Sequence, residues 1–220
     1  MLKKLIEKLQ SMERELNQFD PSKFKDPLAT QIEWSPIKKG GANFGTHKLI
    51  ETDTNRLEFK ASLGAKIFYS IFTIMGMFFA IIFPILMLNT EGESMGFGII
   101  MPVLMGLVFT FVGIYLFYHG IQPIVFDKYK GIFYKGWKTQ ESINYNISSE
   151  NFVRLDNIHA IQLISEYCRG NKSSYYSHEL NLVLKDGKRI NVIDHGNLNK
   201  IREDAKKLSE FLCTPVWDAT

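Results

Sequence analysis

The sequence predicts a membrane α-helical hairpin joined to an α+β domain, in which an antiparallel sheet is closed by a C-terminal amphipathic helix. Three observations support this fold class. The 220-residue chain has two long uncharged apolar segments, several short alternating segments separated by turn sequences, and one apolar stripe of helical period near its C-terminus.

The two apolar segments, 67–88 and 97–118, contain no charged residue and have no polar helical face. At 1.5 Å per residue, each helix would reach about 33 Å, which matches the hydrocarbon core of a bilayer. Two buried core helices are the alternative, but a domain of this size could not cover both on all sides. We therefore expect two transmembrane helices. Neither resembles a cleavable signal peptide, because a long charged segment precedes the first one.

The distribution of positive charge predicts the orientation of the hairpin. Residues 1–66 contain twelve Lys and Arg, residues 119–220 contain fourteen, and the connector 89–96 contains none. Positively charged flanks stay in the cytoplasm. We therefore expect cytoplasmic N- and C-termini and a short external loop.

Three segments precede the first apolar helix. Residues 1–20 have apolar side chains at spacings of three and four, which predicts an amphipathic helix. This helix could pack on its own domain, pair with a copy or a partner, or lie on the membrane surface. Prolines and glycines make 21–45 a predicted linker. Alternation and the turn sequence "DTN" predict a β-hairpin over 46–62.

Residues 120–217 are expected to form a cytoplasmic domain. The stretch "PIVFDKYKGIFYKGWK" at 123–138 predicts one hairpin, which is expected to join the 46–62 hairpin in one sheet beneath the membrane. The stretch "HELNLVLKDGKRINVID" at 178–194 predicts another, with Asp186-Gly187 in its turn. An amphipathic helix follows and is expected to end at Pro215.

This order of strands and a closing helix, after a two-helix hairpin, resembles bacterial membrane proteins with a cytoplasmic pleckstrin-homology-like (PH-like) domain. The resemblance covers roughly residues 120–217 with the hairpin before it. The resemblance rests on the order of the predicted elements and on the wording of short sequence stretches within them, and not on a catalytic signature. It implies a PH-like β-sheet or barrel at the bacterial inner membrane, and it gives no substrate.

No catalytic, nucleotide-binding or metal-binding motif is present. Cys168 and Cys213 lie far apart, form no CxxC pair and predict neither a disulfide nor a zinc site. Asp194 beside His195 could be an acid that orients an imidazole. The competing interpretation is a strand end followed by Gly196 and a capping Asn197, and we favour it. We expect no enzyme activity, no cofactor and no metal.

Basic and aromatic side chains after the second span suit an anionic leaflet and its interface. A polar loop at 169–177 is a further candidate, although a solvated connection explains it as well. The ligand- or lipid-facing candidates are Lys128, Lys130, Lys135, Lys138, Trp137, Arg169 and Lys172. Glycines at Gly76, Gly106, Gly113 and Gly120 are the helix-packing candidates.

The predicted function is that of a scaffold or assembly factor, in which the hairpin tethers a non-catalytic protein- or lipid-binding module to the membrane. The alternatives are a membrane enzyme that uses Asp194 and His195, and a transport accessory or small channel of oligomerised hairpins. Membrane lipids and a protein partner or a second copy are the expected partners. Nucleic acid is not expected, because the net charge of +3 is spread over both cytoplasmic parts.

Overall fold

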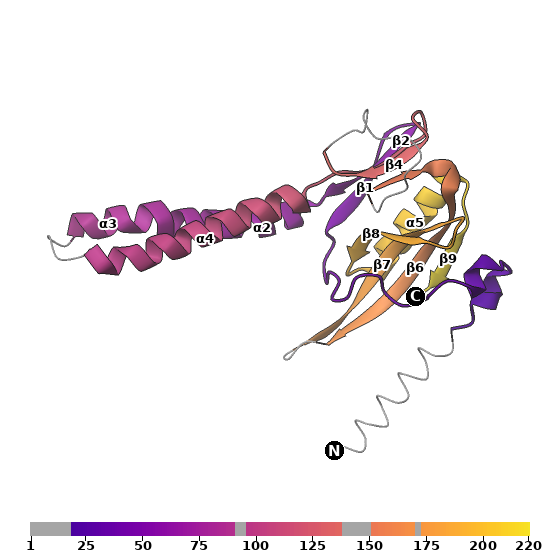
Figure 1. The fold of residues 1–220 in the computed structure, drawn as a ribbon, viewed down its shortest axis with the longest axis horizontal. Coiled ribbons are helices and arrows are strands. Elements are labelled where there is room, and N and C mark those ends of the chain that lie inside the picture. The colour runs from indigo at the N-terminus through magenta and orange to yellow at the C-terminus, as the bar shows by residue number, and fades with distance from the viewer. Residues whose placement is uncertain (1–18, 91–95, 138–150, 170–172) are drawn as a thin grey trace, which may run out of the picture.

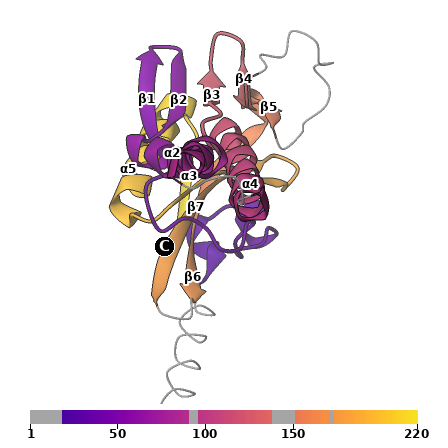
Figure 2. The same cartoon turned by 90° about the vertical axis from the view of Figure 1, so that its left-hand side faces the viewer.

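The computed structural model describes residues 19–90, 96–137, 151–169 and 173–220. A rod of apolar helices leaves one side of a body built from two β-sheets and one helix (Figure 1). Seen along the rod, α2 and α4 lie side by side in front of this body (Figure 2). The predicted N-terminal helix, up to residue 18, and positions 91–95 of the external loop lie outside the described residues.

The first sheet joins two strands that precede the helical rod in the chain with three strands that follow it. Its strand order is β1-β2-β3-β4-β5, and every neighbouring pair is antiparallel. Leu57 pairs with Phe126 where β2 meets β3, so the two hairpins form one sheet, as the sequence predicted. The strands are β1 His47–Asp53, β2 Arg56–Ala61, β3 Ile124–Asp127, β4 Ile132–Lys135 and β5 Phe152–Arg154.

The second sheet has the order β8-β7-β6-β9. Gly187, at φ +83°, makes the predicted turn between β7 and β8. A short strand that follows the last helix, β9, pairs in parallel with β6 and was not predicted, because four residues are too few to show a period. The strands are β6 Ile158–Arg169, β7 Ser174–Leu184, β8 Arg189–His195 and β9 Val216–Ala219.

One hydrophobic core joins both sheets to α5, Leu198–Leu212. Asn197 caps this helix by accepting a hydrogen bond from the Lys200 N–H at 3.1 Å, and Cys213 ends it at φ 54°. An α+β fold is thus confirmed, but the strands of the described residues form two sheets and not a closed barrel. Core side chains include Leu57, Phe59, Phe126, Phe133, Leu163, Leu180, Ile201, Ala205 and Leu208.

The apolar rod consists of α2, Leu63–Met77, a π-helical turn, Phe78–Ile82, then α3, Phe83–Thr90, packed against α4, Gly96–Gly120. The π-turn precedes Pro84, which has no N–H and whose ring would clash with a carbonyl four residues back. Two stretches, Leu63–Leu88 and Gly98–Gly120, are long and apolar enough to cross a membrane.

Glycines allow α2 and α4 to approach backbone to backbone. A Cβ atom on Gly106 would lie 2.4 Å from the Ala80 nitrogen, and one on Gly113 would lie 2.4 Å from the Thr73 nitrogen. Gly76 faces the Thr110 backbone in the same way. Gly120 meets the Tyr69 ring. All four glycines named from the sequence therefore lie between these helices, where the absence of Cβ permits close packing.

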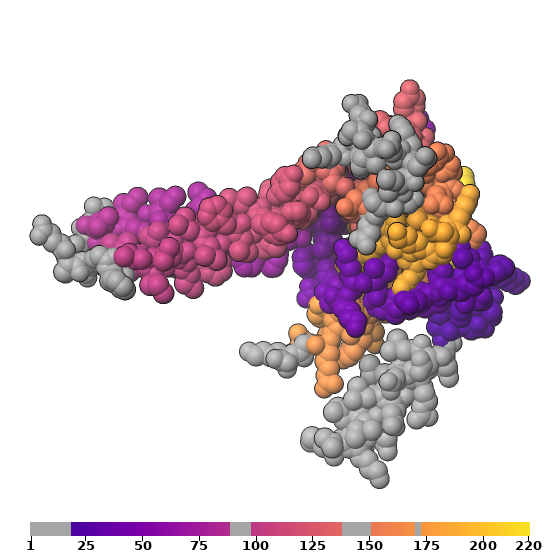
Figure 3. Space-filling view, in the orientation of Figure 1, coloured from indigo at the N-terminus to yellow at the C-terminus, as the bar shows by residue number. Residues whose placement is uncertain are grey.

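Residues 21–45, expected to be a linker, pack along the outer face of the second sheet (Figure 3). This segment, here named the strap, contains two short 3-10 helices, Pro21–Phe24 and Leu28–Thr30. Ala29 is fully buried, and the Trp34 indole donates a hydrogen bond to its carbonyl at 2.8 Å. The strap is therefore part of the fold.

Substitution of Gly106 by Leu should separate α4 from α2 and from the π-helical turn, because a Cβ there would lie 2.7 Å from the Gly76 carbonyl oxygen and 2.4 Å from the Ala80 nitrogen. We expect the free energy of unfolding in detergent to fall by about 1–3 kcal/mol, as for overpacked cores. Gly98→Leu is the matched control, since a Cβ at Gly98 has no atom within 4 Å. Equal thermal stability of the two variants would contradict the packing described here.

Candidate functional site

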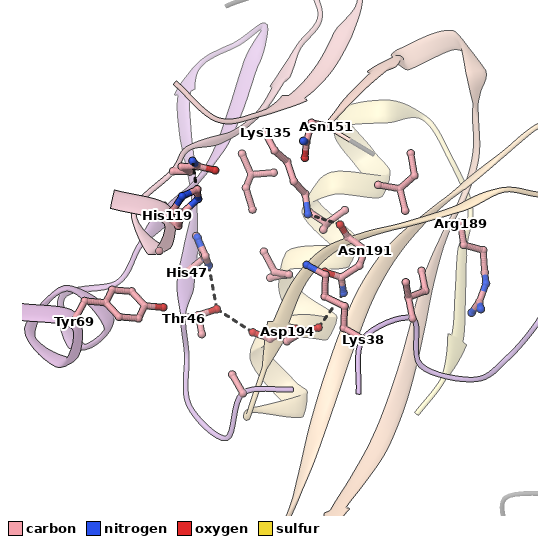
Figure 4. A pocket seen from close by; sticks show the side chains of 18 residues that line it. Lys38, Thr46, His47, Tyr69, His119, Lys135, Asn151, Arg189, Asn191 and Asp194 are labelled. Atoms are coloured by element: carbon pink, nitrogen blue, oxygen red, sulfur yellow. Dashed lines mark hydrogen bonds between the residues drawn. The ribbon is translucent and has the colours of Figure 1, made fainter. Parts of the chain in front are cut away.

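The main candidate site is a cavity of about 360 Å³ between the base of the helical rod and the two sheets (Figure 4). We name it the juxtamembrane cavity. One wall carries His47, Tyr69 and His119, and the opposite wall carries Lys38, Lys135, Asn191 and Asp194. Its residues come from the strap, from strands β1, β3, β4 and β8, and from helices α2 and α4, so no short motif encodes it.

Short connections between helices and strands bring these walls together. Only Ser62 separates β2 from α2, and it caps α2 by accepting from the Ala65 N–H at 3.1 Å. Three residues separate α4 from β3. Tyr69 and His119 are thereby placed above the start of the first sheet, next to His47.

The strap is fixed by a buried carboxylate. Glu179 on β7 is fully buried and accepts hydrogen bonds from the Ile37 N–H at 2.9 Å and the Lys38 N–H at 2.8 Å. Asn181 Nδ2 donates a third at 3.0 Å. Further along, Glu166 accepts from the N–H of Gly40 at 3.0 Å. These bonds place Lys38 at the rim of the cavity.

Lys135 brings a positive charge into the cavity from the end of β4. Its ammonium donates a hydrogen bond to the Asn191 carbonyl oxygen of β8. This contact joins the first sheet to the second across the cavity. Lys135 was among the lipid-facing candidates named from the sequence.

His47 is held in the neutral form. Its burial, together with the nearby charges of Lys135 and His195, lowers its pKa to about 4. Its Nδ1 lies 3.0 Å from the Thr46 hydroxyl, which donates to the Asp194 carbonyl oxygen at 3.0 Å. At neutral pH this imidazole supplies hydrogen-bonding capacity without charge.

Asp194 is the acidic group of the cavity. Burial raises its pKa, a hydrogen bond from Asn191 Nδ2 at 2.9 Å lowers it, and the nearby carboxylate of Glu179 raises it further. Lys38 and Lys135 lie near enough to lower this pKa in turn, so the two lysines and the carboxylate share one charged environment.

Asp194 and His195 have separate partners. His195 lies on the other side of β8, where its Nδ1 accepts a hydrogen bond from the Asn197 N–H at 2.8 Å, and its ring lies against Gly45. The structure therefore gives His195 a role at the start of α5. A different imidazole, His178, lies 2.7 Å from the Ser165 hydroxyl.

The other sequence candidates are dispersed. Trp137 lies near the rod, with its indole 3.5 Å from the Tyr118 carbonyl oxygen. Lys128 and Lys130 are on the far turn of the β3–β4 hairpin, where they line a second hollow of about 410 Å³ with Arg154. Arg169 ends β6 and is exposed. Lys138 and Lys172 lie outside the described residues.

Sequence reasoning missed several cavity residues, because their neighbours in space are distant in sequence. Lys38 and His47 fall within or just after a predicted linker, and Asn191 reads as a solvent-facing strand residue. His119 follows the second apolar segment, and nothing in the sequence pairs it with His47. The one available signal was the position of Tyr69 and His119 near the same end of the two apolar segments.

The His195→Ala variant should lose about 1 kcal/mol of stability, because the N–H of Asn197, the N-cap residue of α5, loses its acceptor. Asn197→Ala is the matched control, since it removes the neighbouring cap without touching an imidazole. We expect both variants to unfold at similarly reduced denaturant concentrations and to keep the cellular phenotype. Loss of the phenotype in His195→Ala alone, at normal abundance, would instead support a chemical role.

The lowered pKa of His47 predicts a pH-dependent stability. Between about pH 6.5 and pH 4 the unfolded chain binds a proton at this position and the folded chain does not, so stability falls as pH falls. His47→Gln should show a shallower decline when unfolding in detergent is followed from pH 7 to pH 4. Asn151→Gln, at a residue that also lines the cavity, changes no titratable group and should keep the original slope. An unchanged slope in His47→Gln would show that this group does not titrate in the stated range.

Comparison of the chain with protein-family models, with curated proteins and with solved structures found no match. The functional argument therefore rests on the geometry of the cavity and its position at the base of two helices that are long and apolar enough to cross a membrane.

Proposed function

We propose that this protein is an integral inner-membrane protein that holds a non-catalytic binding module, PH-like in its layout of strands and terminal helix, at the cytoplasmic face of the bilayer. The supporting observation is the direct continuity of the helical rod with the first sheet. Both spans enter that sheet through connections of one and three residues.

The surface of the rod supports a membrane location. Apolar side chains such as Ile74, Leu104 and Phe111 are largely exposed along it, and few residues of either span are buried. A core helix of a soluble protein would be covered, whereas these helices bury mainly the face on which they meet each other. In water the rod would expose a large apolar surface, and a bilayer removes that cost.

The direction of insertion follows from charge. The β-sheet body lies at the end of the rod where α2 begins and α4 ends, and nearly all Lys and Arg of the chain precede α2 or follow α4 in the sequence. The positive-inside rule assigns this end to the cytoplasm. The rod gives little support to voltage sensing or to an ion pathway. Among the described residues of the rod, Lys66 in the first turn of α2 is the sole Asp, Glu, Lys or Arg.

A rigid attachment makes tethering effective. Because β2 runs into α2 and α4 runs into β3, the body is held in one orientation and cannot swing on a flexible linker. The same face of the body is therefore presented to the membrane or to membrane partners. Confinement at the bilayer raises the effective concentration of the module for such ligands.

Membrane insertion and orientation can be tested with thiol labelling. We expect the protein to resist carbonate extraction and its exposed Cys213 to react with an impermeant maleimide only after the cells are permeabilised. A Ser94→Cys variant, made with Cys213→Ser, should react in intact cells, because Ser94 lies in the expected external loop. The buried Cys168 provides the unreactive background.

Release of the protein by carbonate, or labelling of Cys213 in intact cells, would overturn this proposal. The tethering role is tested by affinity purification in mild detergent together with binding to vesicles of defined headgroup composition. Recovery of a stoichiometric partner or a headgroup preference supports it, and the absence of both contradicts it.

A further inference from the structure

We propose that the juxtamembrane cavity binds the phosphate of an anionic lipid headgroup. This inference rests on the proposed membrane insertion and names the ligand of the cavity. The shared chemistry is that of a phosphate anion, and the lipid is the source that the position of the cavity favours.

The cavity lies at the depth of the headgroups if the rod spans a bilayer. The stretch Leu63–Leu88 is about 39 Å long at 1.5 Å per residue, whereas the hydrocarbon core is about 30 Å thick. The ends of the rod therefore extend into the headgroup layers on both sides. Tyr69, His119 and Gly120, which line the cavity, lie in the part of the rod nearest to the sheets. Tyrosine at this depth is typical of membrane interfaces.

The charge of the lining favours an anion. Lys38 and Lys135 carry the positive charges, and Asp194 is the opposing group. Asp194 is engaged by a hydrogen bond from Asn191 Nδ2 at 2.9 Å, and two lysines against one carboxylate leave an excess of positive charge. Arg189 contributes no charge to the inside of the cavity, because its guanidinium points away from it (Figure 4). That group donates a hydrogen bond to the Ser35 carbonyl oxygen of the strap at 2.8 Å.

The remaining lining suits a headgroup with a short polar extension. Neutral hydrogen-bonding groups of Tyr69, His47 and Asn151 surround the cavity, and Ile37 and Ile193 add apolar surface. A volume of about 360 Å³ is at the lower end of ligand-binding cavities, which suits a phosphate with a glycerol-sized substituent. Basic pockets beside transmembrane helices at the cytoplasmic leaflet are favourable places for anionic headgroups.

The test uses the full-length protein in neutral detergent, titrated with dioctanoyl phosphatidylglycerol and followed by native mass spectrometry. We expect one lipid per chain and an affinity about tenfold lower in Lys38→Gln and in Lys135→Gln, because each removes a charged hydrogen-bond donor. Ala42→Phe keeps every charge but fills the cavity, and it should abolish binding.

Matched controls separate the cavity from general electrostatic attraction. Lys39→Gln and Lys48→Gln remove exposed charges from residues that do not line the cavity, next to Lys38 and His47 in the chain, and each should change the affinity less than twofold. Lys38 is itself exposed, so its substitution leaves the core intact even if Lys135→Gln or Ala42→Phe perturbs folding. Equal weakening by all four lysine variants, or unaltered binding in a folded Ala42→Phe, would overturn the proposal.

Two parallel titrations identify the source of the phosphate. Dioctanoyl phosphatidylcholine should bind at least tenfold more weakly than phosphatidylglycerol, and equal binding would overturn the requirement for an anionic headgroup. Inorganic phosphate should bind more weakly still. If inorganic phosphate alone binds with the same variant sensitivity, the lipid assignment fails. A protein that resists carbonate and has the expected topology, yet binds no phosphatidylglycerol, refutes this inference and leaves the membrane tether standing.

Discussion

The position of the strap depends on the buried carboxylate of Glu179. A carboxylate removed from water is strongly disfavoured unless hydrogen bonds replace its hydration. Glu179 is fully buried and obtains them from the Ile37 and Lys38 N–H groups of the strap and from Asn181. The outer face of the second sheet is therefore stable only when the strap covers it. Because the strap then leads into β1, the same contact also sets where the first sheet begins.

The juxtamembrane cavity follows from that arrangement. The strap carries Lys38 and Ala42 along the edge of β8, Thr46 follows it, and His47 then starts β1. At the other end of the first hairpin, β2 continues into α2. The strap, the sheets and the helical rod thus meet at one place. Glycines between α2 and α4 keep the rod narrow and stiff, so its base has a defined position relative to the sheets. A flexible linker at any of these junctions would remove the cavity.

The elements with a strong local signal could be predicted from the sequence. The helical spans follow from uncharged apolar runs, the β7–β8 hairpin from alternation around Asp186-Gly187, and α5 from its apolar stripe. The strap could not be predicted, because its order comes from side chains more than 100 residues away, as in the bond from Lys38 to Glu179. Glu179 and Asn181 alternate with leucines and so indicate a solvated face, whereas the strap covers that face. The cavity could not be predicted for the same reason, because Lys135 and Asn191 come into contact only when the two sheets have taken their places.

The end of β8 shows how one strand serves both the fold and the cavity. Successive side chains on a strand point to opposite faces, so Asp194 and His195 separate although they are neighbours in sequence. Asp194 pairs in register with Glu179 and faces the strap and the cavity, whereas His195 pairs with His178 and faces the start of α5. A shift of one residue in this register would place the imidazole in the cavity and the carboxylate at the first turn of the helix. The bulge between Leu180 and Asn181 in this strand pair affects both outcomes. It sets which residues of β8 face the cavity and which one accepts a hydrogen bond from the Asn197 N–H at the start of α5.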